Sequence, residues 1–164
     1  MMIAPKVRVG IGQDSHRFLS YEQTKPCVIG GLIFEDEAGL SADSDGDVVL
    51  HALCNAITSL TGIQILSGLV QDLYTKDGIT DSQVYVEKAL QILFPQTIQH
   101  VAFTIEGKRP VLSNRIDEMR SKIADILKIQ ISQVGISCSS GDGLSDVACG
   151  DGLQCFCVLT TIEI

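Results

Sequence analysis

An aspartate and a histidine stand two positions apart near the start of the chain, and a second histidine closes a later segment. Asp14 and His16 lie in the segment GQDSHRF, and His51 ends the segment DSDGDVVLH. In an extended chain, residues two apart point to one face, about 6–7 Å apart, so Asp14 and His16 can converge on one ion. One carboxylate and two imidazoles are a three-ligand set for Zn²⁺ that leaves the fourth position to a substrate. The residue types therefore indicate a metal site.

The same residues also have purely structural explanations. A D-x-H pair in a loop is often solvated, and His51, on a mostly apolar helix, can be a core histidine with satisfied hydrogen bonds. Asp45 and Asp47 can cap the helix that follows them and interact favourably with its dipole. Asp47 and His51 are four apart and share a helix face, so Asp47 is also a candidate to orient the imidazole.

A glycine-rich segment, SSGDGLSD at residues 139–146, is a second place for chemistry. Backbone N–H groups in such turns can hold phosphate oxygens, and the carboxylate of Asp142 can hold Mg²⁺. The alternative is a wide connection whose glycines supply positive φ angles. Lys108 and Arg109 form a basic turn that can meet an anionic ligand or remain solvated.

The elements that must position these residues can be predicted from periodicity. Alternating or continuous apolar runs predict strands, and apolar residues at helical spacing after capping side chains predict helices. The expected strands are residues 6–13, 27–34 with a bulge or bend at Gly30-Gly31, 100–106, 134–139 and 153–164. The expected helices are residues 48–60, 81–93 capped by Asp81 or Ser82, and 113–127 capped by Ser113; residues 61–80 are expected to contain a mobile loop.

This order of strands and helices predicts an α+β layered sandwich. The last strand is apolar on both faces, so we expect helices to cover one face and a partner subunit the other. A chain of 164 residues and 17.6 kDa is about one domain, and we expect residues 1–164 to form it.

Composition excludes several classes of protein. Twelve Lys and Arg against twenty Asp and Glu give a net charge of −8, which argues against sequence-independent nucleic-acid binding. A hydrophobic content of 45% and a mean hydropathy of +0.26 exclude a disordered acidic chain. Residues 1–6 contain no secretory signal, and the uncharged run at residues 48–71 carries too many polar groups for a membrane span. Six cysteines without a C-x-x-C pair favour reduced thiols and a cytoplasmic location.

Three segments together resemble the 2-C-methyl-D-erythritol 2,4-cyclodiphosphate synthase family. They are G-x-D-x-H-R-F at residues 12–18, I-G-G at 29–31 and S-D-G-D-x-x-x-H-A-L at 44–53. The resemblance covers most of the chain. It implies a four-stranded mixed sheet with helices on one face, and a homotrimer in which the sheet faces meet and active sites lie between subunits. It also implies one Zn²⁺ per subunit, held by Asp14, His16 and His51.

The resemblance further implies a metal-dependent phosphorus–oxygen lyase of the non-mevalonate isoprenoid pathway. Such enzymes convert 4-diphosphocytidyl-2-C-methyl-D-erythritol 2-phosphate into the cyclic 2,4-diphosphate: the 2-phosphate attacks the β-phosphorus and CMP leaves. By correspondence, Ser140 contacts phosphate as a catalytic residue, and Asp142 holds Mg²⁺ or Mn²⁺. Asp43, the second catalytic candidate, stands where the family has a phosphate-contacting histidine. The corresponding substrate-binding candidates are Ser44, Ser139, Ser140, Lys108 and Arg109.

Other positions differ from the family pattern. Ile65-Leu66-Ser67 replaces an Asp-Ile-Gly loop that binds the erythritol hydroxyls, Val111 replaces a lysine, and Cys149 replaces a basic residue. Two alternatives to the cyclase are therefore kept. One is a zinc-retaining trimer that binds an isoprenoid or nucleotide diphosphate without turnover. The other is a zinc-dependent phosphohydrolase, which would release an open-chain product.

Overall fold

A four-stranded mixed sheet forms one layer of the computed structural model, which describes residues 4–163. The strand order is β1-β6-β4-β5; β6 runs antiparallel to both β1 and β4, and β5 runs parallel to β4. The bounds are β1 Lys6–Arg17, β4 Thr97–Glu106, β5 Val134–Ser139 and β6 Gly152–Glu163. The predicted α+β class, with a mixed sheet of four strands and helices, is confirmed.

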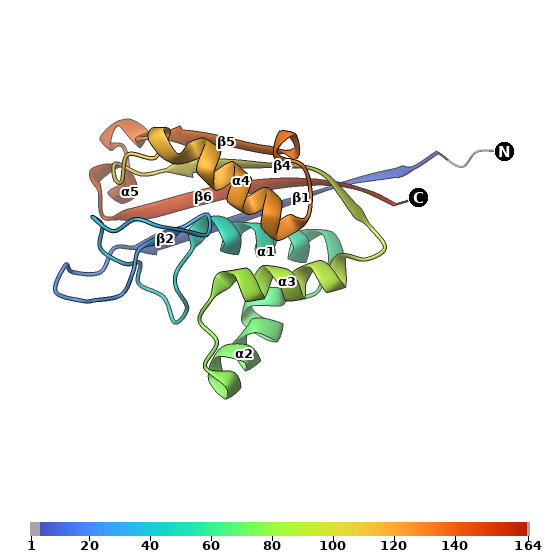
Figure 1. Cartoon of the computed structure of the whole chain (residues 1–164), viewed down its shortest axis with the longest axis horizontal. Helices are drawn as coiled ribbons and strands as arrows, with labels where there is room; N and C mark the ends of the chain where they lie inside the picture. The colour runs from blue at the N-terminus through green and yellow to red at the C-terminus, as the bar shows by residue number, and fades with distance from the viewer. Residues whose placement is uncertain (1–3, 164) are drawn as a thin grey trace.

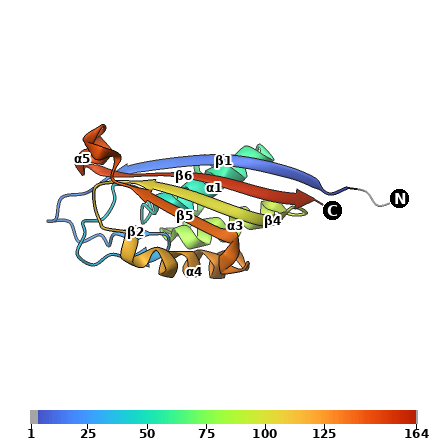
Figure 2. The ribbon, with the colours of Figure 1, turned by 90° about the horizontal axis from the view of Figure 1, so that it is seen from above.

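Helices cover one face of this sheet. Seen from above in Figure 2, the strands lie in front of α1 and α3, and α4 runs along the lower edge of the view beside β5. α2 lies farther from the sheet than α1 and α3, and the short α5 lies at the opposite end from the two chain termini (Figure 1). The helix bounds are α1 Val48–Thr61, α2 Val70–Asp77, α3 Ser82–Leu93, α4 Ile116–Leu127 and α5 Asp146–Cys149.

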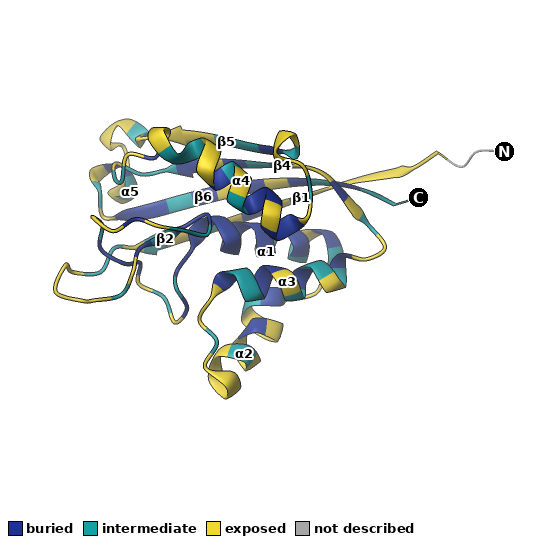
Figure 3. Cartoon of the chain, viewed as in Figure 1, coloured by how far each residue is buried: buried dark blue, intermediate teal, exposed yellow. Residues whose placement is uncertain are grey.

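α1 is the central helix of the core, and its residues are dark blue along most of its length in Figure 3. Two glycines of β1 allow it to lie directly on the sheet. A Cβ at Gly12 would stand 2.0 Å from the carbonyl oxygen of Ala52, and one at Gly10 would stand 2.4 Å from that of Ala56. Only glycine permits such a close approach of strand and helix backbones.

The other face of the sheet carries exposed apolar side chains. Val7, Val9 and Ile11 alternate along β1 with exposed fractions of 62–64%, and Phe156 and Val158 of β6 are each 41% exposed. β1 and β6 are neighbours, so these residues form one patch, called here the outer sheet face. A contiguous apolar patch of this kind is typical of a surface that another protein covers.

Two expected elements differ from the structure. Residues 27–34 form a hairpin of β2 (Val28–Ile29) and β3 (Leu32–Ile33) rather than one bent strand, because both turn glycines have positive φ angles and reverse the chain. Residues 61–80 are largely helical rather than a loop: a π-helical turn, η1 (Ile65–Leu69), leads into α2. Burial of Ile65 and Val70 against the core outweighs the weak helical pattern of this segment.

Smaller differences concern the ends of elements. β1 continues to Arg17, four residues beyond the predicted end, and β4 begins at Thr97 rather than at residue 100. Ser113 opens a 3₁₀ turn, η2 (Ser113–Arg115), and does not cap α4, which has no side-chain cap. Other 3₁₀ turns are η3 (Ile131–Gln133) and η4 (Gly141–Gly143). The N-terminal residues 1–3 and the predicted strand end at Ile164 lie outside the described residues.

All six cysteines are free thiols, four of them buried. Within residues 4–163 no single helix is long and apolar enough to cross a membrane. The helical segments Val48–Thr61 and Ile65–Asp77 reach that length and composition only when taken together, and the chain bends by 109° between them.

Candidate active site

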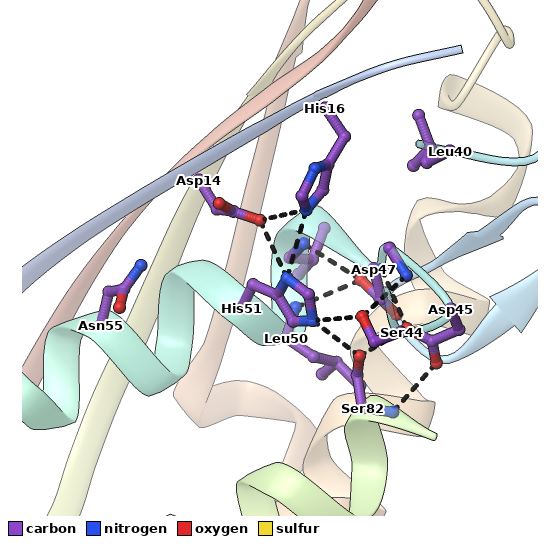
Figure 4. A network of polar contacts seen from close by, with 12 residues as sticks. Asp14, His16, Leu40, Ser44, Asp45, Asp47, Leu50, His51, Asn55 and Ser82 are labelled. Atoms are coloured by element: carbon purple, nitrogen blue, oxygen red, sulfur yellow. Dashed lines mark hydrogen bonds and ion pairs between the residues drawn. The ribbon is translucent and has the colours of Figure 1, made fainter. Parts of the chain in front are cut away.

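Asp14, His16 and His51 converge on one point at the surface between β1 and α1. Figure 4 shows their side chains directed toward one another from these two elements. Asp14 Oδ2 lies 2.9 Å from His16 Nε2 and 3.0 Å from His51 Nδ1, and the two nitrogens are 3.3 Å apart. Among the described residues this is the group of potential ligands gathered closely enough to hold an ion.

This geometry fits a divalent metal. Ligands at about 2.0–2.1 Å from a tetrahedral ion are about 3.3–3.4 Å from one another. The two nitrogens are separated by this distance, and the Asp14 oxygen, at 2.9 and 3.0 Å, lies slightly nearer to each of them. A set of two imidazole nitrogens and one carboxylate oxygen leaves a coordination position free, as catalytic rather than structural sites do.

The electrostatics of the three residues favour an ionised carboxylate. Burial alone would raise the pKa of Asp14, but hydrogen bonds and charges from His16 and His51 outweigh it and lower the pKa to about 2. Asp14 therefore remains an anion over the whole neutral range and is a suitable ligand for a cation.

The alternation of β1 and the start of α1 position the ligands. Asp14 and His16 are on the same face of the strand as Gly10 and Gly12, where α1 makes its close approach. His51 lies in the first turn of α1 and thus directly above this stretch of strand.

Asp47 fixes the start of α1 and does not orient His51 as its spacing suggested. Its fully buried carboxylate caps the helix by accepting the N–H groups of Val49 and Leu50. It also accepts the N–H groups of Gly30 at 2.9 Å and Gly31 at 2.6 Å, which ties the β2–β3 hairpin to the helix. Burial raises the pKa of Asp47 to about 6, and these N–H donors oppose the rise.

The partners of His51 on its far side are two serines. Its Nε2 lies 2.9 Å from Ser82 Oγ and 3.1 Å from Ser44 Oγ. Ser82 is fully buried at the start of α3 and also bonds to Asp45. The sequence analysis identified Ser82 only as a helix cap. Its link to His51 spans 31 residues and follows no local pattern, so only the folded structure brings it out.

A cavity of about 450 Å³ opens beside the three ligands. Asp43 and Ser44 contribute to one side of it. Its other walls come from the η1–α2 segment and α3, through Leu66, Ser67, Val70, Gln71, Tyr74 and Tyr85. The cavity thus combines charged ligands, an apolar wall and neutral hydrogen-bonding groups, as small-molecule sites do.

Lys25 is a further residue of this region that the sequence analysis missed. Its ammonium donates to the carbonyl oxygens of Leu40 and Ala42 at 2.7 and 2.8 Å, which holds the chain just before Asp43. Burial lowers the pKa of Lys25, and the charges of Asp45 and Asp43 oppose this shift. The cation therefore offsets part of the negative charge of the loop.

The glycine-rich segment forms a separate turn. Ser139 Oγ accepts the Gly141 N–H at 3.1 Å, Ser140 Oγ accepts the Asp142 N–H at 3.4 Å, and Asp142 has a φ of 51°. These residues are not among the described residues that line the cavity. Within one subunit, Ser139, Ser140 and Asp142 are therefore not brought together with the three ligands.

The basic turn has two different side chains. Lys108 is exposed, whereas Arg109 is engaged within the chain. The Arg109 guanidinium pairs with Glu37, lies 3.9 Å above the Phe18 ring and donates to Gly150 O at 3.2 Å. Lys108 and Arg109 are both predicted to contact substrate. Among the described residues Arg109 is held in an ion pair with Glu37, whereas Lys108 is exposed and forms no ion pair.

Known proteins share this fold and much of this sequence. The YgbB family profile matches residues 7–162. The 2-C-methyl-D-erythritol 2,4-cyclodiphosphate synthase of Chlamydia felis is 54% identical over 157 residues, which cover 95% of this chain and 89% of that relative.

Solved structures of cyclodiphosphate synthases have the same fold as this chain. The cyclodiphosphate synthase of Plasmodium vivax superposes with a TM-score of 0.80 at 25% identity, over 97% of this chain and 99% of that one. IspF of Plasmodium falciparum, solved as a CDP complex, has the same fold: its TM-score is 0.82 at 20% identity, over 96% of each chain. With its three ligands on β1 and α1, the chain belongs to the YgbB family, that of the 2-C-methyl-D-erythritol 2,4-cyclodiphosphate synthases.

Proposed function

We propose that this chain is a cyclodiphosphate synthase, a metal-dependent phosphorus–oxygen lyase. It converts 4-diphosphocytidyl-2-C-methyl-D-erythritol 2-phosphate into the cyclic 2,4-diphosphate and CMP, a step of isoprenoid precursor synthesis. The observation that carries this proposal is the convergence of Asp14, His16 and His51 beside a cavity, in a chain 54% identical to a synthase of that name.

The reaction needs alignment and charge neutralisation more than a protein nucleophile. An oxygen of the 2-phosphate forms a bond to the β-phosphorus, and the bond from that phosphorus to the bridging oxygen breaks, so CMP leaves with the oxygen and its electron pair. No water is consumed. When bound by Asp14, His16 and His51, a divalent ion, by our proposal Zn²⁺, neutralises and polarises a phosphate at this position.

The chain's own side chains have definable tasks in the cavity. The Ser44 hydroxyl lines it and can donate to a phosphate oxygen, while Leu66 and Val70 limit the access of water. Ser67, Gln71 and Tyr74 are neutral donors and acceptors on the wall formed by η1 and α2. We propose that they bind the erythritol hydroxyls in place of the loop found elsewhere in the family.

We further propose that the active protein is a homotrimer of single-domain subunits. The exposed apolar outer sheet face supports such an assembly, since water would otherwise contact it. A neighbouring subunit then supplies Ser139, Ser140 and Asp142, with Asp142 as a ligand for Mg²⁺ or Mn²⁺ and Lys108 near the nucleotide. The free thiols are consistent with a cytoplasmic location.

The test is the release of CMP from the cytidylylated methylerythritol 2-phosphate, with Zn²⁺ and Mg²⁺ present and the second product identified by mass. CMP together with the cyclic diphosphate supports the proposal. Absence of CMP from a zinc-loaded protein contradicts it and favours a binding protein. CMP with an open-chain diphosphate contradicts it in favour of hydrolysis.

A further inference from the structure

The side of His51 that faces away from the other ligands ends in a buried chain of hydrogen bonds. His51 Nε2 is 2.9 Å from the hydroxyl oxygen of Ser82, a residue with no exposed surface. The Ser82 hydroxyl donates to Asp45 Oδ1, and its backbone N–H donates to Asp45 Oδ2 at 3.0 Å. Figure 4 shows this sequence of contacts running from the ligands to the start of α3.

The direction of these bonds decides which nitrogen of His51 carries hydrogen. A serine hydroxyl has one proton, and here it goes to the carboxylate of Asp45. The Ser82 oxygen can then offer His51 only its lone pairs. Nε2 must therefore donate, so that Nδ1, the atom 3.0 Å from Asp14 Oδ2, is the nitrogen directed at the ion.

Ser44 is less able than Ser82 to fix the hydrogen on His51 Nε2. Its hydroxyl lies 3.1 Å from the same nitrogen and also accepts the Gly46 N–H at 3.2 Å. Within residues 4–163 the Asp45 carboxylate accepts hydrogen bonds from Ser82 and from the Asp47 N–H, not from Ser44. The proton of Ser44 is thus not fixed by a carboxylate and can turn into the cavity.

We propose that Ser82 and Asp45 are positioning residues for the metal site, holding His51 in the tautomer and orientation that bind the ion. This inference rests on the proposed metal site. Partners of this kind, which bond to the second nitrogen of a ligand histidine, typically account for about 10–100-fold in metal affinity.

The Asp45 loop also ties the site to the rest of the fold. The Asp45 N–H donates to Thr80 O at 2.8 Å, so the loop before α1 is joined both to the segment just before α3 and to Ser82, the first residue of α3. The orientation of His51 is therefore set by two elements, not by α1 alone.

The experiment measures zinc affinity of the full chain by competition with a chromophoric chelator. Ser82→Ala removes the acceptor and should raise the Kd for Zn²⁺ about 10–100-fold. Asp45→Asn keeps the side-chain volume but replaces one carboxylate oxygen with an amide nitrogen. When the amide N–H donates to the Ser82 oxygen, the Ser82 hydroxyl proton turns toward His51. This substitution should weaken zinc binding as well, and it carries the test if Ser82→Ala does not fold.

Thr161→Val is the matched control. Thr161 is as fully buried as Ser82, and its hydroxyl donates to Gln96 Oε1 at 2.6 Å, away from the metal ligands. Both substitutions remove a buried hydroxyl, so both should lower the melting temperature of the metal-free chain, but only Ser82→Ala should change the Kd. The ligand-field spectrum of the Co²⁺-loaded protein, which reports ligand geometry, should shift in Ser82→Ala and not in Thr161→Val.

The outcomes are distinguishable. A folded Ser82→Ala protein that binds Zn²⁺ as tightly as the parent overturns the role of Ser82 and leaves the metal site intact. Equal weakening in Thr161→Val also overturns it, because the effect would then be one of general stability. A parent chain that binds no Zn²⁺ contradicts the proposed site itself and this inference with it.

Discussion

The ligand set determines how much positive charge reaches the substrate. Two neutral imidazoles and one carboxylate leave a divalent ion with a net charge of +1, whereas a second carboxylate would cancel it. Because the pKa of Asp14 is lowered to about 2, its contribution of one negative charge is constant at neutral pH. In a chain of net charge −8, a divalent ion held by these three residues would supply the local positive charge that two approaching phosphates need.

Replacing His51 tests whether this residue is a ligand of the proposed zinc site. His51→Ala should abolish the retention of zinc and the release of CMP, because two ligands hold Zn²⁺ far more weakly than three. The fold should persist, since the surrounding α1 residues are apolar and buried. Metal content by atomic absorption, with far-ultraviolet circular dichroism as the folding control, measures both. Zinc retained at the parent level would exclude His51 as a ligand.

Binding of the second cation, Mg²⁺, is predicted to depend on the carboxylate of Asp142. Asp142→Ala should raise the Mg²⁺ concentration for half-maximal activity by about tenfold, because a charged oxygen ligand is lost. Zinc content should not change, since Asp142 is not among the three converging ligands. Asp125→Ala, a change at an exposed position of α4, is the control. An unaltered Mg²⁺ titration would remove Asp142 from its proposed role.

α1 is the element on which the site depends, and Asp47 determines where it begins. Asp47→Ala leaves the N–H groups of Gly30 and Gly31 and the first turn of α1 without their acceptor. We expect a loss of about 2–4 kcal/mol in the free energy of unfolding, from the cap and the buried donors together. Denaturant unfolding measures it.

Asp81→Ala is the matched control for that substitution. Asp81 is exposed, and in the part of the chain that the structure describes its carboxylate accepts only the Gln83 N–H, which caps α3. Its loss should cost about 1 kcal/mol. If both substitutions cost the same, the hairpin contacts of Asp47 contribute nothing to stability.

The η1–α2 segment carries the prediction about substrate recognition. Gln71→Ala should raise KM about 3–10-fold with a smaller effect on kcat, since a neutral hydrogen bond to the substrate contributes roughly 0.5–1.5 kcal/mol. Thr75→Ala, on the same helix but outside the cavity lining, should leave KM unchanged. Steady-state kinetics measure KM and kcat for both variants. Equal effects of the two substitutions would contradict a contact between Gln71 and the substrate.

Elements with strong periodicity were predictable from the sequence, and those that depend on tertiary contacts were not. α1, α3 and β5 lie within a residue of their predicted bounds because capping residues and apolar spacing define them locally. The η1–α2 segment was not predicted because burial of Ile65 and Val70 against the core decides its conformation. Likewise, the spacing of Asp14 and His16 indicated the ligands, but the Ser82 contact depends on how α3 packs against α1.

The molecule as a whole presents two unlike faces. Helices cover one side of the sheet, and the outer sheet face exposes Val7, Val9 and Ile11 beside two apolar residues of β6. This contiguous exposed apolar patch is the feature that supports the proposed assembly.

A charge placed on this face should prevent assembly. Val9→Glu is expected to convert the proposed trimer, of about three times 17.6 kDa, into monomers, because a carboxylate would be desolvated in the proposed interface. Ile131→Glu, at a 43% exposed position in the η3 turn between α4 and β5, should leave the mass unchanged. Light scattering coupled to size exclusion gives the masses. A Val9→Glu protein of unchanged mass would show that the subunits meet elsewhere.

β1 and β6 pair residue for residue from Lys6–Glu163 to Arg17–Gly152 without a bulge. A slip of one residue would turn Asp14 and His16 to the opposite face of the sheet. A misaligned chain therefore cannot assemble the three ligands, whatever else it folds correctly. If the site holds zinc as proposed, the zinc bound per chain after refolding measures the fraction of molecules in which β1 has its native alignment.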